Sequence, residues 1–529
     1  MDKELSQRVC ILLGIILLLN NCNYKINDEK PNILLIMVDD MGYSDIGCYG
    51  GEIQTPNLDK LASEGIRFTR YYNTAKCFPS RACLLTGQYA QHNGMSQKAT
   101  KFTNAVTIAE VLRESGYRTL MTGKHHGEVN PYYFGFDRYF GLKDGSCNHF
   151  NPGLQRNGEV LPAHKKGKFQ PREWGIDSTL HIPYTPPEKD FYTTDYFTNY
   201  SINYLEEYKD EDKPFFMYVA YTAPHDPLMA WPEDQQKYFG KYMGGYEAIR
   251  KKRFNRQKEM GLIDKNYPLS APTYEDWEAL SRDDKLMRDS IMSTHAAMVD
   301  RVDQNIGRIL DKLEELDKLD NTLILFMSDN GAQSQSSPNS WLWANGKNSD
   351  FSQPIGSMGR YTSLSLSWAN VSNTPFRLYK SNSHEGGISS PLIIYWKGKV
   401  INPGSINDFP SHLIDIMPTI LETTGASYPD KYKNEKINPV DGISLLPVIK
   451  GSKTTRSEPL FWQWQKGKAV RKEKWKLVSD NNEPWKLYNI ETDQTETKNL
   501  INEFPEVANE LASDWEGWIN ESGVTIKSK

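Results

Sequence analysis

The feature that most constrains the fold is an apolar run that stops abruptly at two acidic residues. Residues 33–38 read ILLIMV, and Asp39 and Asp40 follow directly. A continuous run of this length, rich in branched side chains and without alternation, is typical of a strand that is buried on both faces of a sheet. Because such a strand needs a covering layer on each side, the run predicts a large α/β domain with acidic side chains at the end of an interior strand.

Strand and helix patterns alternate after this run. Apolar residues have helical spacing in residues 58–66, 108–112 and 298–313, whereas FFMYVA and TLILFM read as buried strands. Alternation of this kind predicts a large, mostly parallel mixed sheet sandwiched by helices. In such sheets ligands collect at the carboxyl ends of the strands. The expected strand ends are followed by polar residues in three places: Asp39-Asp40, His225 and Asp329-Asn330.

The pattern changes after about residue 427. A polar stretch, DKYKNEKINPVDG, is followed by short strand-like segments with tight turns and by the helical tail FPEVANELASDWEGWINE. We therefore expect a main domain over residues 31–427 and a C-terminal subdomain over residues 428–529. The subdomain should be a small antiparallel sheet with a terminal helix.

The N-terminus has the composition of an export signal. Arg8 precedes an apolar run over residues 9–19, which is shorter than the roughly 20 apolar residues that span a bilayer. Residues 1–22 resemble a bacterial lipoprotein signal ending at Cys22, with residues 23–30 as a tether. This predicts an exported bacterial protein of the periplasm or outer-membrane surface, attached to a membrane only through a lipid on Cys22. An uncleaved anchor and a plain secretory signal are the alternatives.

Composition excludes some partners and leaves one cysteine to explain. The formal net charge is −5 and no long basic block is present, so nucleic acid is not expected as a partner. Beyond the signal, the cysteines show neither metal-ligand spacing nor a disulfide framework. We interpret Cys48, Cys83 and Cys147 as packing residues, which leaves Cys77.

The charged segment 239–282 predicts a solvated helical insertion, and residues 334–367 predict a long loop at the wall of a site.

The acidic strand ends predict a metal site. Asp39, Asp40, Asp329 and Asn330 offer oxygen atoms only, and oxygen ligands suit a hard cation such as Ca²⁺ or Mg²⁺. Adjacent buried acids repel each other strongly unless a cation lies between them. The alternative is that these are ordinary polar residues where strands run into loops. Two such motifs at the ends of separate strands favour the metal site.

The stretch KCFPSRACLLTG places Cys77 beside a helix start. Pro79 suits the first turn of a helix, so we expect Cys77 just before its N-terminus, where free backbone N–H groups favour an anion. Arg81 adds a planar fork suited to a tetrahedral oxyanion. A thiolate would be stabilised there as well, but sulfur matches a hard cation poorly. The mismatch indicates an oxygen group made from the thiol.

These residues also resemble a known family. CFPSRACLLTG is similar to the Cys-x-Pro-Ser-Arg-x-x-x-Leu-Thr-Gly signature of type I, formylglycine-dependent, arylsulfatase-like sulfatases in the alkaline-phosphatase-like superfamily. The resemblance extends from residue 32 to about residue 500 and includes the motifs TGKHH, APHDP, SDNG and HEGGISSPLIIYW. It implies that residues 31–427 form the catalytic domain of a sulfuric ester hydrolase.

The resemblance also implies a set of site residues. A separate formylglycine-generating maturation enzyme would oxidise Cys77, and the hydrated aldehyde would supply the nucleophilic oxygen. One cation, Ca²⁺ or Mg²⁺, would be held by Asp39, Asp40, Cys77, Asp329 and Asn330. The catalytic residues would be Cys77, Arg81, Lys124, His126, His225 and Lys380. His225 would protonate the departing oxygen or bind sulfate, and His126 would accept a proton from the hydrated aldehyde, although Gly127 and Glu128 replace the family's Leu-Gly there.

The expected substrate is a sulfated glycan or an aryl sulfate. Two alternatives remain open at this stage. One is a formylglycine-dependent hydrolase of phosphodiesters or phosphonates, and the other is a non-catalytic surface protein that binds sulfated glycans.

Overall fold

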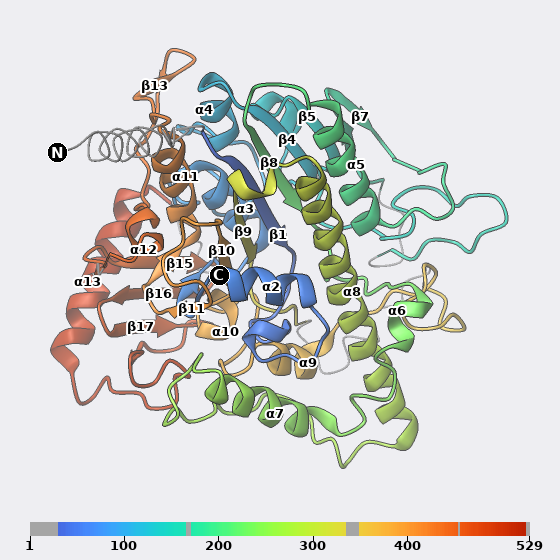
Figure 1. Ribbon diagram of the computed structural model, residues 1–529. Helices are drawn as coiled ribbons and strands as arrows, with labels where there is room; N and C mark the ends of the chain where they lie inside the picture. Colours follow the sequence, from blue (N-terminus) through green and yellow to red (C-terminus); the bar gives the residue numbers. More distant parts are fainter. Residues whose placement is uncertain (1–29, 165–170, 335–348, 453–454, 525–529) are drawn as a thin grey trace, which may run out of the picture. The chain divides into compact units, whose positions relative to one another are not determined.

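The apolar run of residues 33–38 forms an interior strand. In the computed structural model it is β1 (Asn32–Val38), every residue of which is buried. Both neighbours, β8 (Phe215–Ala220) and β9 (Thr322–Ser328), run parallel to it (Figure 1). The side chains of β1 alternate between two cores. Ile33, Leu35 and Met37 belong to one apolar cluster, whereas Leu34, Ile36 and Val38 belong to the other.

The main sheet has ten strands in the order β11-β2-β10-β9-β1-β8-β4-β5-β6-β7. Besides β1, β8 and β9, this sheet contains β2 (Ile66–Phe68), β4 (Arg118–Gly123), β5 (Arg138–Leu142), β6 (Trp174–Ile176), β7 (Thr179–His181), β10 (Leu392–Tyr395) and β11 (Ser405–Asn407). The five central strands from β9 to β5 are mutually parallel, while β10, β6 and β7 introduce antiparallel pairs. The predicted mostly parallel mixed sheet is therefore confirmed.

Helices cover both faces of this sheet. One apolar cluster includes residues of α2 (Pro56–Glu64), α5 (Thr193–Glu207) and α8 (Arg282–Glu315). The opposite cluster includes residues of α3 (Cys77–Thr86), α4 (Ile108–Glu114) and α11 (Ile416–Thr424). The other helices are α6 (Pro232–Gln236), α7 (Gly245–Glu259), α9 (Ser365–Ser372), α10 (Glu385–Ile388) and α12 (Leu446–Ile449). The sandwich predicted from the alternating patterns is the observed arrangement.

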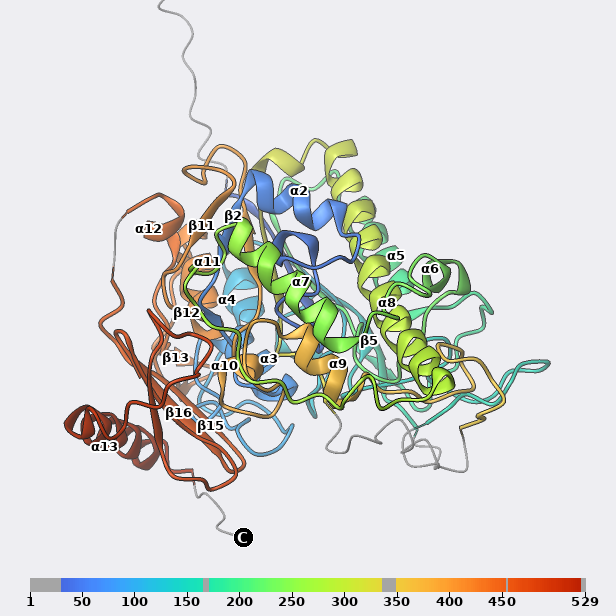
Figure 2. The same ribbon diagram turned by 90° about the horizontal axis from the view of Figure 1, so that it is seen from below.

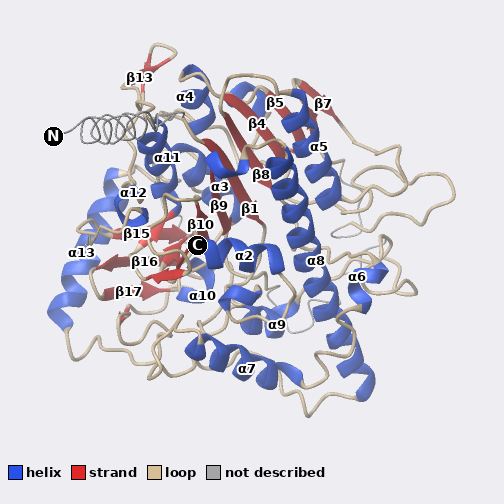
Figure 3. Cartoon of the chain, viewed as in Figure 1, coloured by secondary structure: helices blue, strands red, loops and turns tan. Residues whose placement is uncertain are grey.

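The C-terminal part forms a second, smaller sheet. Its four antiparallel strands are β15 (Leu460–Trp464), β16 (Gly467–Lys472), β17 (Trp475–Ser479) and β18 (Lys486–Asn489), followed by α13 (Pro505–Glu521). Figures 2 and 3 show these strands and α13 grouped together, away from α5 and α6. The small pairs β3 (Tyr71–Tyr72) with β12 (Ser411–His412), and β13 (Lys431–Tyr432) with β14 (Glu435–Lys436), complete the strands. The predicted antiparallel sheet with a terminal helix is confirmed.

The structure describes residues 30–164, 171–334, 349–452 and 455–524. The predicted signal of residues 1–22 and the tether up to residue 29 lie outside these ranges, so both stay predictions. Asn32–Lys529 form one compact unit, and the boundary expected at residues 427–428 also stays a prediction. In the described ranges, no helix combines the length and apolarity that crossing a bilayer requires.

The charged insertion differs from the expectation in one respect. Residues 245–259 do form a helix, α7, but part of its charged face points inward. Arg253 is fully buried and lies 2.7 Å from both Asp45 and Glu52. The expectation of a solvated helix is therefore wrong for this face. The acidic partners of Arg253 lie in a loop about 200 residues earlier in the chain, so no local pattern indicates them.

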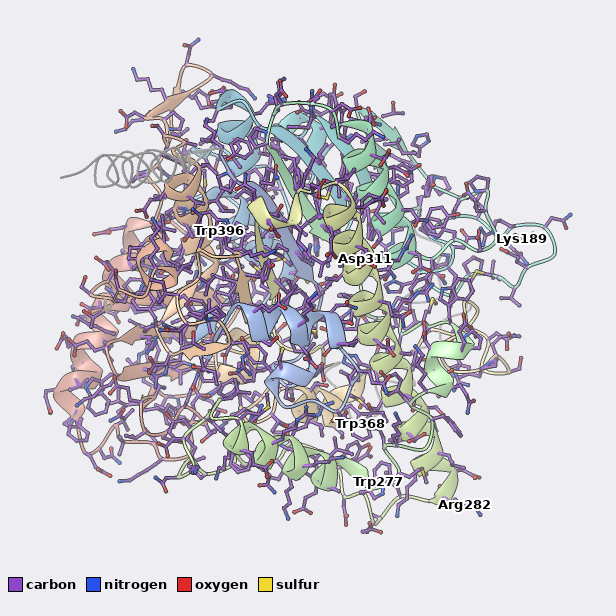
Figure 4. The ribbon with its side chains drawn as sticks, viewed as in Figure 1. Lys189, Trp277, Arg282, Asp311, Trp368 and Trp396 are labelled. Atoms are coloured by element: carbon purple, nitrogen blue, oxygen red, sulfur yellow. The ribbon has the colours of Figure 1, made fainter. Side chains whose placement is uncertain are left out.

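The aromatic residues beside this helix are packing residues. Trp368 of α9 and Trp277 lie near α7 (Figure 4), with their ring centroids 6.2 Å apart. Trp368 is fully buried, and its indole N–H donates a hydrogen bond to the Arg288 carbonyl oxygen. The ring therefore has no free face for a ligand.

A buried ion triad joins the small sheet to the main domain. Lys476 of β17 places its Nζ 2.7 Å from Glu385 Oε1 and 2.9 Å from Glu496 Oε1, and all three side chains are fully buried. Burial lowers the pKa of Lys476, but the two glutamates raise it above its usual value overall. Lys476 is therefore a charged ammonium group whose burial is balanced by two carboxylates.

Removal of this ammonium should be costly. We expect Lys476→Ala to lower the free energy of unfolding by about 3–5 kcal/mol, because it removes the ammonium group that two buried carboxylates share. Lys472→Ala is the matched control, since Lys472 is partly exposed in β16 and pairs with Glu510 and Asp514. Its cost should be about 0–1 kcal/mol. Urea titrations of the two variants measure the difference, and equal stabilities would contradict the interpretation of the triad.

Candidate active site

The predicted polar residues follow parallel strands at one edge of the main sheet. Asp39 follows β1, Lys124 follows β4 and Asp329 follows β9, and these strands are parallel to each other or to the shared neighbour β8. Parallel strands end at the same edge, so their following residues meet there. The glycine that ends β4, Gly123, has φ +101°, and a Cβ there would lie 1.9 Å from the Ala220 carbonyl oxygen. The chain therefore needs glycine to bring Lys124 into position.

A sharp turn brings both acidic residues of β1 to this edge. Successive side chains of an extended strand point to opposite faces. Asp40 instead has φ 66°, in the left-handed region that aspartate tolerates better than most residues. One ligand atom from each of Asp39, Asp40, Cys77 and His225 lies within 4.8 Å of the others. The two adjacent acids therefore converge on one point.

Cys77 begins helix α3 instead of preceding it. Lys76 is the N-cap residue, Cys77 is the first helical residue and Pro79 is the third. This corrects the expectation that Cys77 lies just outside the helix, and the reason is that the first four helical N–H groups need no internal acceptor, so proline fits at any early position. Cys77 still lies at the positive end of the helix dipole.

The Arg81 guanidinium forms hydrogen bonds with other residues of the cluster. Its Nε and Nη2 donate to Asp329 Oδ2 at 3.1 and 2.8 Å, and its Nη1 donates to the Lys124 carbonyl oxygen at 3.1 Å. The planar fork therefore fixes a carboxylate of the predicted metal site. Its predicted support of the substrate stays a prediction.

Two lysines and a histidine surround the acidic pair. Lys124 Nζ lies 2.5 Å from Asp39 Oδ2, and Lys380 Nζ donates to Asp40 Oδ1. His225 Nε2 lies 3.4 Å from Asp40 Oδ2. Asn330 Nδ2 also donates to Asp40 Oδ1, at 2.6 Å. The residues predicted from the sequence are thus brought into one cluster, in which all but His126 and His225 are buried.

The cluster contains oxygen atoms that lack hydrogen-bond donors. Asp39 Oδ1, Asp40 Oδ2 and Asn330 Oδ1 are buried, and none of them accepts a hydrogen bond from the part of the chain that the structure describes. Buried acceptors without partners are rare in folded proteins. Three such oxygens from the ends of β1 and β9 fit the ligand preference of a hard divalent cation. The donor set therefore agrees with a Ca²⁺ or Mg²⁺ site.

The charges in the cluster shift its proton equilibria. Burial raises the pKa of Asp39, but Lys124 and His225 lower it overall to about 2. Burial likewise raises the pKa of Cys77, but Lys124 and other nearby cations lower it well below its usual value. For His225, burial lowers the pKa, whereas Asp40 and Asp39 raise it overall to about 10. At neutral pH the cluster therefore presents a protonated His225 and favours an anion at position 77.

The geometry distinguishes His126 from its neighbour. The His126 side chain lies close enough to Cys77 to interact with it, and its backbone has φ 65°. Burial and the charge of Lys124 lower the pKa of His126 to about 4, so the ring is neutral at pH 7. His125 is also buried, with a pKa lowered to about 3 by burial, but the structure gives it no hydrogen bond to Cys77. Of the two histidines, His126 is the one in position to exchange a proton with residue 77.

Two residues that the sequence analysis did not select hold His225 in place. Its Nδ1 lies 2.9 Å from Asp226 Oδ1, and Asp226 in turn accepts hydrogen bonds from Tyr361 and Ser363. His149 Nε2 lies 3.0 Å from the His225 carbonyl oxygen. Asp226 could have been selected, because it directly follows His225 in APHDP. No local signal marks His149.

Comparison with known proteins gives the family. The sulfatase family model matches residues 31–426, and the model for the C-terminal part of N-sulphoglucosamine sulphohydrolase matches residues 377–518. An uncharacterised sulfatase of Schizosaccharomyces pombe is 32% identical over 543 residues, which cover 95% of this chain and 96% of that one. An arylsulfatase of Klebsiella aerogenes is 32% identical over 446 residues, covering 79% and 92%.

A solved structure agrees with these matches. The crystal structure of Ps i-CgsB in complex with k-i-k-neocarrahexaose superposes with a TM-score of 0.65 and 27% identity, covering 93% of each chain. The family match spans most of the sequence, and the structural match spans both the main sheet and the C-terminal sheet. The chain therefore belongs to the sulfatase family, within the alkaline-phosphatase-like superfamily, and is a sulfuric ester hydrolase.

Proposed function

We propose that this protein hydrolyses sulfate esters of glycans, with a nucleophile derived from Cys77 and one divalent cation, Ca²⁺ or Mg²⁺. The observation that carries the proposal is the meeting of Cys77 with three donor-free oxygens and with the cationic side chains of Lys124, Lys380 and His225. A glycan is favoured because the solved relative Ps i-CgsB holds the oligosaccharide k-i-k-neocarrahexaose. Aryl sulfates are the expected small model substrates.

The site is suited to a group with charge on several oxygens. A sulfate monoester carries its negative charge over three terminal oxygens, and the charge distribution changes as the bond to the alcohol breaks. Fixed positive groups aimed at such oxygens stabilise a transition state without needing to reorganise. Lys124 and Lys380 are both buried and held by Asp39 and Asp40, so their ammonium groups are already in place.

Two groups would complete this site. A divalent cation held by Asp39, Asp40, Asp329 and Asn330 would act as a Lewis acid toward the sulfuryl oxygens. Oxidation of Cys77 to formylglycine by a maturation enzyme would supply a hard oxygen nucleophile in place of the thiol. The donor-free oxygens and the lowered pKa of Cys77 support both assignments.

Proton transfer is divided between the two histidines. Neutral His126, which lies beside residue 77, accepts a proton there. Protonated His225 donates to the departing alcohol oxygen, because its Nδ1 is held by Asp226 and its Nε2 faces the cluster near Asp40. Their pKa values of about 4 and about 10 leave one ring neutral and the other charged at pH 7. Opposite shifts of this kind are a common basis for assigning base and acid.

A substrate panel tests the proposal. Protein produced together with a formylglycine-generating enzyme should release sulfate from at least one defined sulfated sugar and from an aryl sulfate, and should act more slowly on aryl phosphates and phosphonates. Cys77→Ala should lower kcat by several orders of magnitude, as loss of a nucleophile does in other hydrolases. Its unfolding temperature should stay close to that of the unsubstituted protein.

Cys83→Ala is the matched control, because Cys83 is a second buried cysteine of α3 and lies in the apolar core. This variant should lose some stability but retain turnover. Full turnover by Cys77→Ala would exclude the proposed nucleophile. Faster hydrolysis of phosphonates would favour the alternative hydrolase, and binding of sulfated sugars without turnover would favour the binding protein.

The cation site is tested by calorimetry. After removal of metals with a chelator, titration with Ca²⁺ or Mg²⁺ should show one binding site, and Asp40→Asn should weaken it roughly 100-fold or more. The control is Asp289→Asn, a buried aspartate that accepts hydrogen bonds from the backbone of Gly240 and Tyr242. It should bind the cation normally. Unaltered binding by Asp40→Asn would contradict the ligand assignment.

The proton donor is tested through the leaving group. We expect His225→Asn to slow hydrolysis of sugar sulfates by about 10²–10⁴-fold, the range for loss of a general acid. The loss should be much smaller for nitrophenyl sulfate, whose leaving oxygen needs little protonation. The ratio of the two losses is the measurement, and it needs no second variant. Equal losses for both substrates would show that His225 serves sulfate binding alone.

A further inference from the structure

A second cavity lies where the edge of the main sheet approaches the C-terminal sheet. Its volume is about 700 Å³, and it is lined by residues that belong to or follow β2 and β11, by the segment before β15 and by residues of β16 and its turn. The described residues that line it include none of the catalytic cluster. A cavity of this size is in the range of small-molecule sites.

One of the residues that line the cavity, Arg471, has a buried guanidinium group with unsatisfied N–H groups. Arg471 of β16 is only 3% exposed, and its Nε and Nη1 find no acceptor among the described residues. No ion pair is formed by Arg471 in the described part of the chain. Its cross-strand neighbour Lys476 differs sharply, since two glutamates neutralise it. Arginine keeps its charge in proteins, so an unpaired buried guanidinium is costly unless an anion completes it.

Packing orients this guanidinium without satisfying its N–H groups. The group lies over the ring of Tyr72, with its central carbon 5.5 Å from the ring centroid. Contact with a ring covers the face of the guanidinium and leaves its N–H groups, which lie in its plane, for an acceptor. Tyr72 therefore orients Arg471 without satisfying its hydrogen bonds.

The other two arginines of the cavity are paired. Arg70 lines it and lies 3.1 Å from Asp408, whose carboxylate is mostly exposed. Arg456 lines it as well and is held by Asp415 at 2.7 and 3.1 Å. Among the described residues, Arg471 is therefore the arginine of this cavity that has no carboxylate in contact. Glu473 and Glu491, which also line the cavity, are exposed and form no ion pair with Arg471.

We propose that this cavity is a second binding site, which takes one oxyanion group on the planar fork of Arg471. A fork of parallel N–H donors fits the oxygens of sulfate, phosphate or a carboxylate better than it fits a spherical ion. The group has two sources: a free inorganic anion, or a sulfate carried by a glycan at a distance from the ester that is cleaved. Only the second source rests on the proposed function.

Binding and stability test the proposal together. Titration calorimetry with inorganic sulfate, and separately with inorganic phosphate, should show one site more in the unsubstituted protein than in Arg471→Met. Without added anion, the unfolding temperature of Arg471→Met should equal or exceed that of the unsubstituted protein, because the substitution removes a buried guanidinium whose hydrogen bonds are unsatisfied. Hydrolysis of a small aryl sulfate should be unchanged. Lys472→Met, next in the same strand, is the control and should bind as the unsubstituted protein does.

Kinetics with sulfated oligosaccharides distinguish a sulfate carried by a glycan from a free inorganic anion. If the group belongs to a glycan, Arg471→Met should raise KM for longer sulfated oligosaccharides and leave KM for the aryl sulfate unchanged, even where the inorganic anions bind weakly. Arg471→Lys should recover part of the loss, since it restores the charge without the fork. Identical titrations and identical KM values for Arg471→Met and the unsubstituted protein would overturn the proposal. So would a marked loss of stability in Arg471→Met without added anion, which would assign Arg471 a structural role.

Discussion

Compensation of buried charge at the carboxyl edge of the main sheet is the constraint on which the rest of the structure depends. Asp39, Asp40 and Asp329 are fully buried within a few ångströms of one another, which no fold tolerates without counter-charges. Arg81 and Lys124 supply two of these charges directly. Since each charge comes from a different element, the cluster forms only when the whole sheet and helix α3 are assembled.

The same constraint extends into the small C-terminal sheet. Lys476 holds Glu385, and Glu385 begins the short helix that follows the loop carrying Lys380. The backbone of that loop also donates from Ser381 to the carbonyl oxygen of Ala75, two residues before Cys77. The ion triad therefore stabilises the segment that carries Lys380, one of the two lysines of the proposed site. Stability of the small sheet and geometry of the site are coupled through one buried ammonium group.

The main sheet and most of the site could be predicted from the sequence. Buried strands are read from continuous apolar runs, and parallel strands bring their ends together, which is why Asp39 and Asp329 could be paired in advance. The inward turn of Arg253 could not be foreseen, because its acidic partners lie far away in the sequence. His126 was selected through the family resemblance, but the left-handed turn of the backbone at His126 could be seen only in the structure. The partners of His225 were missed because hydrogen bonds across loops leave no periodic signal.

The C-terminal sheet also contacts the immediate surroundings of Cys77. The indole N–H of Trp462 donates to the carbonyl oxygen of Asn73 at 2.7 Å, in the segment that leads into α3. Trp464 packs edge-on against Phe78, with ring centroids 5.3 Å apart, and Phe78 packs in the same way against His126 at 5.6 Å. The ring of His126, the proposed base, is thus supported, through Phe78, by a strand of the other sheet. The predicted boundary near residue 427 therefore divides the sequence but not the active site, because residues on both sides of it set the position of the proposed base.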